Sequence, residues 1–212
     1  MVNTNRENTD MKKILEILRS SLLAGICIGI AGFGYLAVGG IAGAVAFCCG
    51  LIAVVAYKLK LYTGTAGFIV KGELGTLMLV LLGNILGCLC MALLARVSPM
   101  PLQETAEKIL SARLATGPWK AGLLAIGCGF LMTTAVTFAR RGQWLPLLFC
   151  VPMFIFCGFP HCVADAFYSL TCSLSFWGEH LWSILLLYLC IVIGNFVGCN
   201  LYRLITFRTQ PD

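Results

Sequence analysis

The sequence predicts an all-α membrane protein with six transmembrane helices, arranged as two inverted three-helix repeats in which helices two and five are broken. Three observations lead to this prediction. Hydrophobic residues make up 59% of the chain and charged residues only 11%, whereas a soluble domain carries about 25% charged residues. Uncharged stretches long enough to cross a bilayer recur along the chain. The pattern G-N-x-x-G-C occurs once in each half.

The first half contains three predicted spans. Residues 1–19 are polar and are expected to form a cytoplasmic segment that leads into a short amphipathic helix. Residues 20–57 carry no charge, which gives room for two crossings of ~20 residues each, with Gly39-Gly40 as a tight turn between them. The second crossing includes a polar break at Lys58–Thr65. The third span is Leu74–Ala95.

The second half repeats this plan after one substantial loop, Arg96–Lys120. Span four is Ala121–Ala139, span five begins near Leu145, and span six is Leu181–Tyr202. Span five is broken around His161, and its second piece is expected to end at about Trp177. Residues 20–207 therefore form one predicted transmembrane domain, followed by a tail at 208–212.

The basic residues orient the predicted spans. Cytoplasmic loops carry an excess of Lys and Arg, and six crossings place both termini on one side. Nine of the fifteen basic residues fall on the terminal side, four on the other side and two within the membrane; the four are Arg96, Lys108, Arg113 and Lys120. We therefore expect a multi-pass protein of the cell membrane with both termini in the cytoplasm.

The internal repeat rests on two short matches. Gly83–Cys88 in span three recurs as Gly194–Cys199 in span six, and Ala24-Gly25 in span one is echoed by Ala121-Gly122 in span four. Three spans per half make the second copy inverted. The glycines are typical of helix-packing grooves. The repeated asparagines, Asn84 and Asn195, are either members of a buried network or donors that line a pore.

His161 lies in a stretch, Gly142–Ala164, that has no Asp, Glu, Lys or Arg. An ionisable group at membrane depth usually faces a water-filled path or a partner. The alternative is a packing histidine whose ring bonds to the backbone. Two interrupted apolar segments, one in each half, indicate a substrate path at the bilayer midplane, and the break at Lys58–Thr65 supplies the second.

Five segments together resemble the formate/nitrite transporter family of anion channels. They are SLLAGICIGIAG at Ser21–Gly32, LYTGT at Leu61–Thr65, GNILG at Gly83–Gly87, GFPHCVADAF at Gly158–Phe167 and GNFVG at Gly194–Gly198. The resemblance covers roughly residues 14–207. A broken L-[FY]-T-G segment paired with G-F-x-H is specific to the family, whereas each piece alone is not.

The resemblance implies an aquaporin-like protomer, a homopentamer, and a pore in each protomer for small monovalent anions such as formate, nitrite or hydrosulfide, coupled to protons. By position, His161 matches the central pore histidine of the family and Thr63 the threonine that faces it. Further matches are apolar constriction residues and an asparagine near the histidine; these are Leu61, Tyr62 and Phe159, and Asn195.

Two residues depart from the family pattern in complementary ways. Lys60 stands where the family usually has an acidic residue, and Asp165 stands where it usually has asparagine. A buried Lys60–Asp165 pair would compensate both changes. Alternatively, Lys58 and Lys60 extend to the interface and Asp165 caps the helix that follows His161. The family also leads us to expect a basic residue on the outer side before span four, for which Arg113 or Lys120 is suitable.

The chemistry of the predicted pore follows from the cost of moving an anion through hydrocarbon. An anion that loses its hydration needs positive charge and donors, or a proton that neutralises it. Imidazole titrates near pH 6.5 when unperturbed, so His161 is the predicted proton donor, and Thr63 either donates to the substrate or fixes the histidine tautomer. Positive potential is expected from Lys60 if its side chain points inward.

Two other functions compete with an anion channel. An aquaporin-like channel for neutral solutes needs donors but no titratable group, so His161 disfavours it. A membrane-embedded thiol oxidoreductase would use some of the twelve cysteines, but no C-x-x-C motif occurs. We expect no enzyme activity, no cofactor and no nucleic-acid partner. We also expect no metal site, because one histidine without a nearby glutamate does not make one.

The topology is testable by labelling. A cysteine introduced at Gln103, in the predicted external loop, should react with an impermeant thiol reagent added to intact cells, because the positive-inside rule places this loop outside. The unaltered chain gives the background from its own cysteines. Labelling of a cysteine in the N-terminal segment, together with no labelling at Gln103, would reverse the orientation.

Overall fold

The computed structural model describes the backbone of residues 2–208 and the side chains of residues 11–208. Every regular element in this part of the chain is a helix. The helices are α1 (Val2–Val38), α2 (Gly40–Ala46), α3 (Cys48–Ala56), α4 (Tyr62–Ala66), α5 (Leu74–Ala95), α6 (Leu102–Thr116), α7 (Pro118–Arg140), α8 (Leu145–Phe156), α9 (Cys162–Thr171), α10 (Leu174–Cys199) and α11 (Leu201–Thr206).

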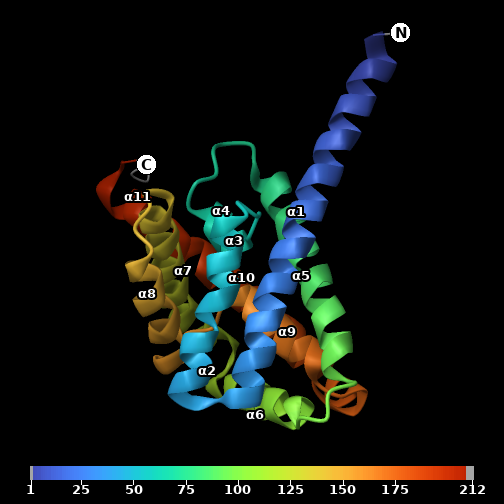
Figure 1. Cartoon of the computed structure of the whole chain (residues 1–212), viewed down its shortest axis with the longest axis vertical. Helices are drawn as coiled ribbons and strands as arrows, with labels where there is room; N and C mark the ends of the chain where they lie inside the picture. Colours follow the sequence, from blue (N-terminus) through green and yellow to red (C-terminus); the bar gives the residue numbers. More distant parts are fainter. Residues whose placement is uncertain (1, 209–212) are drawn as a thin grey trace.

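Four helices in the described part are long and apolar enough to cross a membrane: the part of α1 from Met11, α5, α7 and α10. Two shorter apolar stretches, Gly40–Ala56 and Leu145–Phe156, lie beside them. Figure 1 shows the start of α1, the loop between α4 and α5, and α11 at one end of the molecule, and α6 with the α1–α2 turn at the other. We call these the terminal end and the α6 end.

The two largest helix interfaces are those of α1 with α5 and of α7 with α10. Glycines allow both pairs to approach closely. A Cβ on Gly25 of α1 would overlap the Asn84 carbonyl, and a Cβ on Gly129 of α7 would overlap the Asn195 carbonyl. The residue that matches Gly25 is therefore Gly129, and the match with Gly122 inferred from sequence is wrong. Short sequence matches do not fix the register of an apolar helix, because small residues recur in it at several spacings.

Most predicted helix positions agree with the structure. The third span is α5 with the bounds predicted, and Gly39 and Gly40 make the turn after α1 with φ of 65° and 55°. Three details differ. Helix α1 runs without interruption from Val2, so the predicted short amphipathic helix is continuous with the first span. The piece after His161 ends at Thr171, and α10 begins at Leu174.

The early start of α10 has a local cause. The Ser173 side chain accepts a hydrogen bond from the Phe176 N–H at 3.1 Å and so caps the helix. Glu179 and His180 lie within the first two turns of α10, and their side chains are largely exposed. Exposed polar residues near a helix end do not interrupt the helix.

Helices α3 and α8, which precede the short helices α4 and α9, end in the same way. The Leu59 N–H donates to Val54 O at 2.8 Å, and the Phe159 N–H donates to Phe154 O at 2.9 Å. These six-to-one hydrogen bonds are typical of helices that end in a left-handed residue. That residue is Gly158 after α8, with φ 67°, but it is Lys58 after α3, with φ 53°.

The left-handed lysine gives a test of this geometry. Lys58→Gly should raise the melting temperature of the purified protein, because glycine has no Cβ to oppose a positive φ, and the gain should reach about 1 kcal/mol. Gly158→Ala should lower the melting temperature by a comparable amount, because alanine opposes the positive φ. No steric clash adds to this cost, since a Cβ there meets only Arg113 Nη1, at 4.0 Å. Lys58→Ala is the matched control. A rise with alanine equal to that with glycine would mean that charge removal is the cause.

Candidate pore site

Asn84 of α5 holds the start of α4. Its side chain is fully buried. The side-chain oxygen accepts from the Tyr62 N–H at 2.8 Å, and Nδ2 donates to Ser21 O at 2.8 Å and to Lys60 O at 3.0 Å. One carboxamide therefore satisfies an unpaired N–H of the new helix, a carbonyl of the preceding segment and a carbonyl of α1.

Asn195 of α10 holds the start of α9 through the same set of contacts. Its buried side chain accepts from the Cys162 N–H at 2.8 Å and donates to Ala125 O at 2.8 Å and Pro160 O at 3.0 Å. All six of these hydrogen bonds join the asparagine side chains to backbone groups. Of the two roles left open by the sequence, the buried network is the one that this geometry favours.

Thr63 and His161 meet where the two interrupted segments come together. The Thr63 Oγ1 lies 3.0 Å from His161 Nε2. Thr63 is fully buried and His161 is 2% exposed. Thr63 is the second residue of α4, and His161 is the N-cap of α9. Residues that are 98 positions apart in the chain thus form one hydrogen-bonded pair, in the arrangement that the sequence predicted.

The second ring nitrogen of His161 defines the direction of this hydrogen bond. Nδ1 accepts from the Ala164 N–H at 3.1 Å, which caps α9. A neutral imidazole has one donor and one acceptor nitrogen, so its proton is on Nε2. Nε2–H therefore donates to Thr63 Oγ1, and the Thr63 hydroxyl keeps its own proton for another acceptor.

The aromatic neighbour of His161 is Phe154 of α8. The two rings stack with centroids 5.6 Å apart, and Phe154 contacts Phe47 edge to face at 5.8 Å. Phe159, which the family resemblance suggested for this place, has its ring against Gly127 of α7. Phe154 and Phe47 could not be chosen from the sequence among its thirteen phenylalanines, because apolar residues at membrane depth carry no pattern that marks a pore.

The remaining predicted constriction residues lie next to Thr63. Leu61 and Tyr62 are each 1% exposed, with Leu61 as the N-cap of α4. The Tyr62 hydroxyl donates to Val192 O of α10 at 3.3 Å. Tyr62 therefore ties α4 to α5 through its backbone N–H and to α10 through its hydroxyl.

The predicted Lys60–Asp165 pair is wrong. Asp165 is 2% exposed and forms its ion pair with Arg113 of α6, Nε to Oδ1, at 3.2 Å. Lys60 is exposed, and its backbone N–H donates to Ser20 Oγ at 3.0 Å. The reason is that α6 packs on α9 and brings a cation from the opposite end of the molecule. The alternative role of Asp165 as a cap is confirmed, because Oδ2 accepts from the His161 N–H at 2.8 Å.

Arg113 bridges the segment that carries His161. Besides its ion pair with Asp165, its Nη1 donates to the Gly158 carbonyl. The guanidinium thus holds the last turn after α8 and the first turn of α9, with His161 between them. Its side chain is 19% exposed, so the pair is only partly shielded from solvent on the α6 end.

A cavity of about 460 Å³ opens towards the terminal end beside Thr63. Lys58, Gly64 and Arg140 are among its lining residues. The Arg140 Nη2 lies 3.4 Å from Gly64 O, and its guanidinium stacks 3.8 Å from the centroid of the Phe68 ring. The lysine of the cavity is Lys58 and not Lys60, so the positive potential expected from Lys60 comes from its neighbour two positions earlier.

Comparisons with known proteins identify the family and the fold of this chain. Residues 1–207 match the family described as formate/nitrite transporter. The chain belongs to the formate/nitrite transporter family. Its members are transporters and not enzymes, so this is an integral membrane protein of a transport family. No curated relative matches the sequence.

Two solved structures share the fold. A pentameric formate channel with formate bound has a TM-score of 0.75 and 23% identity, over 93% of this chain and 99% of that one. An ion channel of the FNT family has a TM-score of 0.74 and 20% identity, over 95% of this chain and 93% of that one. The match spans nearly the whole of each chain, so this chain shares their overall fold.

The Arg113–Asp165 pair gives a double-mutant test. Arg113→Gln leaves a buried carboxylate without its cation, which should lower the free energy of unfolding by about 3 kcal/mol. It should also reduce the flux of small anions such as formate, because His161 is displaced. Asp165→Asn should be milder, because its side-chain oxygen still accepts the His161 N–H. The double variant should recover part of the loss, measured as melting temperature and as flux.

Lys120→Gln removes an exposed cation from the first turn of α7, the helix that follows α6, and is the matched control. It should leave both the melting temperature and the flux unchanged. Strictly additive effects of Arg113→Gln and Asp165→Asn would mean that the two side chains do not act as a pair.

Proposed function

We propose that the chain forms a channel or proton-linked transporter for small monovalent anions of the formate, nitrite or hydrosulfide class. The single observation that carries the proposal is the buried Thr63–His161 pair at the junction of two interrupted helices. Membership of the formate/nitrite transporter family supports it. The substrate path runs past this pair, from the cavity lined by Lys58 and Arg140 to the α6 end.

The proposed protomer has six membrane crossings in two inverted repeats. The four long helices α1, α5, α7 and α10 supply one crossing each. The pieces α2–α3 with α4, and α8 with α9, supply the other two as broken crossings. The matched contacts of Asn84 and Asn195 support the repeat, because each holds the start of a short helix in the same way. Both termini lie in the cytoplasm by the positive-inside rule.

The proposed assembly is a homopentamer with one pore in each protomer. The fold shared with a pentameric formate channel supports it. The long helices of the single chain also expose large apolar side chains, among them Leu82, Leu93, Leu185 and Leu189. These side chains are available for lipid and for neighbouring protomers.

Anion selectivity begins at the mouth of the path. Lys58 and Arg140 line the cavity on the terminal side and raise the local concentration of small anions. Deeper in, the walls become apolar. Phe154 stacks on the His161 ring and Phe47 packs against Phe154; they are 4% and 2% exposed. A bare anion is excluded there, because its hydration is lost without compensation.

Proton transfer at the central pair removes this barrier. An anion beside Thr63 accepts the hydroxyl proton in a hydrogen bond, while the hydroxyl oxygen accepts from His161 Nε2–H. When the ring takes up a second proton at Nδ1, the cap bond from the Ala164 N–H opens. The charged ring then gives its Nε2 proton through the Thr63 hydroxyl to the anion, which leaves as the neutral acid. Asp165 and its partner Arg113 are the charged groups beside this step.

His161→Asn tests the mechanism. Asparagine is a good N-cap residue, so it replaces the contact with the Ala164 N–H but cannot titrate. We expect the variant to fold and assemble, and to lose the pH dependence of flux. It should conduct anions in a channel-like way or not at all. The measurement is formate, nitrite and hydrosulfide flux into proteoliposomes between about pH 5 and 8, the range of imidazole titration.

Water flux through the same proteoliposomes separates this function from a neutral-solute channel. Thr63→Val is the companion variant, because it keeps the shape of the side chain and removes the hydroxyl that bonds His161. It should also remove the pH dependence of anion flux, because the proton path through the hydroxyl is lost. An unchanged rate and pH profile in His161→Asn would make His161 a packing residue.

A further inference from the structure

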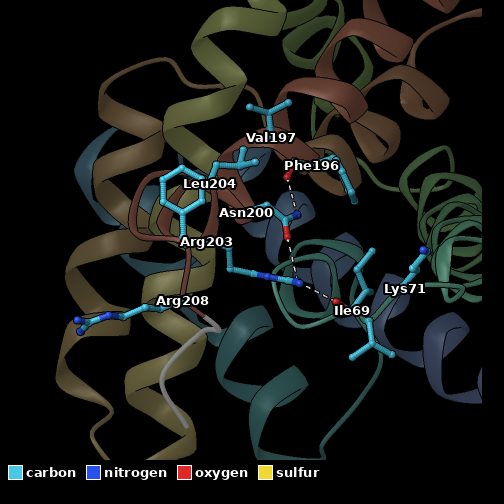
Figure 2. A pocket seen from close by; sticks show the side chains of 10 residues that line it. Ile69, Lys71, Phe196, Val197, Asn200, Arg203, Leu204 and Arg208 are labelled. Carbon is cyan, nitrogen blue, oxygen red and sulfur yellow. Dashed lines mark hydrogen bonds between the residues drawn. The ribbon is translucent and has the colours of Figure 1, made fainter.

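A second cavity, of about 740 Å³, lies at the terminal end, away from the Thr63–His161 pair. It is bordered by the segment after α4, the last turn of α10, and α11 (Figure 2). It shares no lining residue with the cavity beside Thr63. Nothing in the proposed transport mechanism uses it.

Arg203 is fixed inside this cavity. Its Nη1 donates to Ile69 O at 2.8 Å and lies 3.4 Å from Asn200 Oδ1. Asn200 is itself held, because its Nδ2 donates to Ala66 O at 3.1 Å. Among the described residues, Arg203 has hydrogen-bond partners only for Nη1. The Nε–H and Nη2 groups of a pre-positioned guanidinium are therefore left for a ligand.

The charges around Arg203 favour an anion. Lys71 and Arg208 also line the cavity, and Figure 2 shows them on opposite sides of Arg203. The nearby carboxylate of Glu73 accepts the Val70 N–H at 2.9 Å, so it bonds to the backbone of the same segment. Among the described residues, three cations against one carboxylate leave the cavity positive.

The cavity also has an apolar, exposed side. Phe207 is 92% exposed, Val70 62% and Leu204 57%. The cavity lies at the level where two apolar spans reach the terminal end. The span of α10 ends there at Cys199, and the span of α5 begins there at Leu74, so this level corresponds to the edge of the membrane. A free phosphate needs no apolar wall at this depth, whereas a lipid brings both a phosphate and acyl chains.

We propose that this cavity binds the headgroup phosphate of an anionic phospholipid in the leaflet on the terminal side. Arg203 binds the phosphate oxygens through its guanidinium, since arginine matches phosphate with two parallel hydrogen bonds. Lys71 and Arg208 add charge on either side. The acyl chains lie over Leu204 and Phe207 and shield them from water.

The test measures the melting temperature of the purified full-length protein in detergent during titration with phosphatidylglycerol. Phosphatidylcholine and inorganic phosphate are the comparison ligands. Phosphatidylglycerol should raise the melting temperature, and the other two should not. In Arg203→Lys the titration should shift to about tenfold higher lipid concentration, because lysine keeps the charge but loses the paired hydrogen bonds. Lys71→Gln, which breaks no described hydrogen bond, should shift it in the same direction.

Two controls make the result specific. Arg19→Gln removes an exposed cation of α1 and should leave the titration unchanged. His161→Asn should also respond to the lipid normally, so a failure of the transport mechanism is distinguishable from a failure of this proposal. An equal response to inorganic phosphate would make the cavity a free-anion site. An equal response to phosphatidylcholine, or unshifted titrations in both Arg203→Lys and Lys71→Gln, would overturn the phosphate contact.

Discussion

The structure depends on how backbone groups are satisfied where a helix is interrupted at membrane depth. Hydrocarbon offers no hydrogen bonds, so an irregular backbone segment persists there only if the protein supplies partners for its N–H and C=O groups. Asn84 and Asn195 do this with one buried carboxamide each. Each side chain joins a short helix, the segment before it and a long neighbouring helix, so the interruption is held rigidly.

The candidate site follows from this arrangement. Because Asn84 fixes the start of α4 and Asn195 fixes the start of α9, Thr63 and His161 are brought within 3.0 Å of each other. The cap that His161 Nδ1 provides to α9 leaves Nε2 to face Thr63. The same contact that ends an interruption thus also sets the tautomer of the ring. His161 therefore both caps α9 and bonds Thr63, and a proton placed on its Nδ1 would break the cap.

The charges near His161 show where pattern reasoning stops. Lys60 and Asp165 are complementary in sign and lie in the two interrupted segments, which made them a plausible pair. The structure joins Asp165 to Arg113 instead, because α6 packs on α9 from the α6 end. Sign and depth restrict the possible partners of a buried carboxylate. They do not identify the partner, since that choice depends on which helix packs against it.

The sequence by itself determined the membrane class, the long helices, the two interruptions and the family, because apolar length and the L-Y-T-G and G-F-P-H motifs are local properties of the chain. It also identified Thr63, His161 and both asparagines. Only the tertiary structure decided which residues surround them: Phe154 beside the His161 ring with Phe47 against Phe154, Arg113 as the partner of Asp165, and Lys58 at the cavity mouth. These are contacts between segments far apart in the chain. They depend on the rotation and register of packed helices, which apolar sequence leaves nearly degenerate.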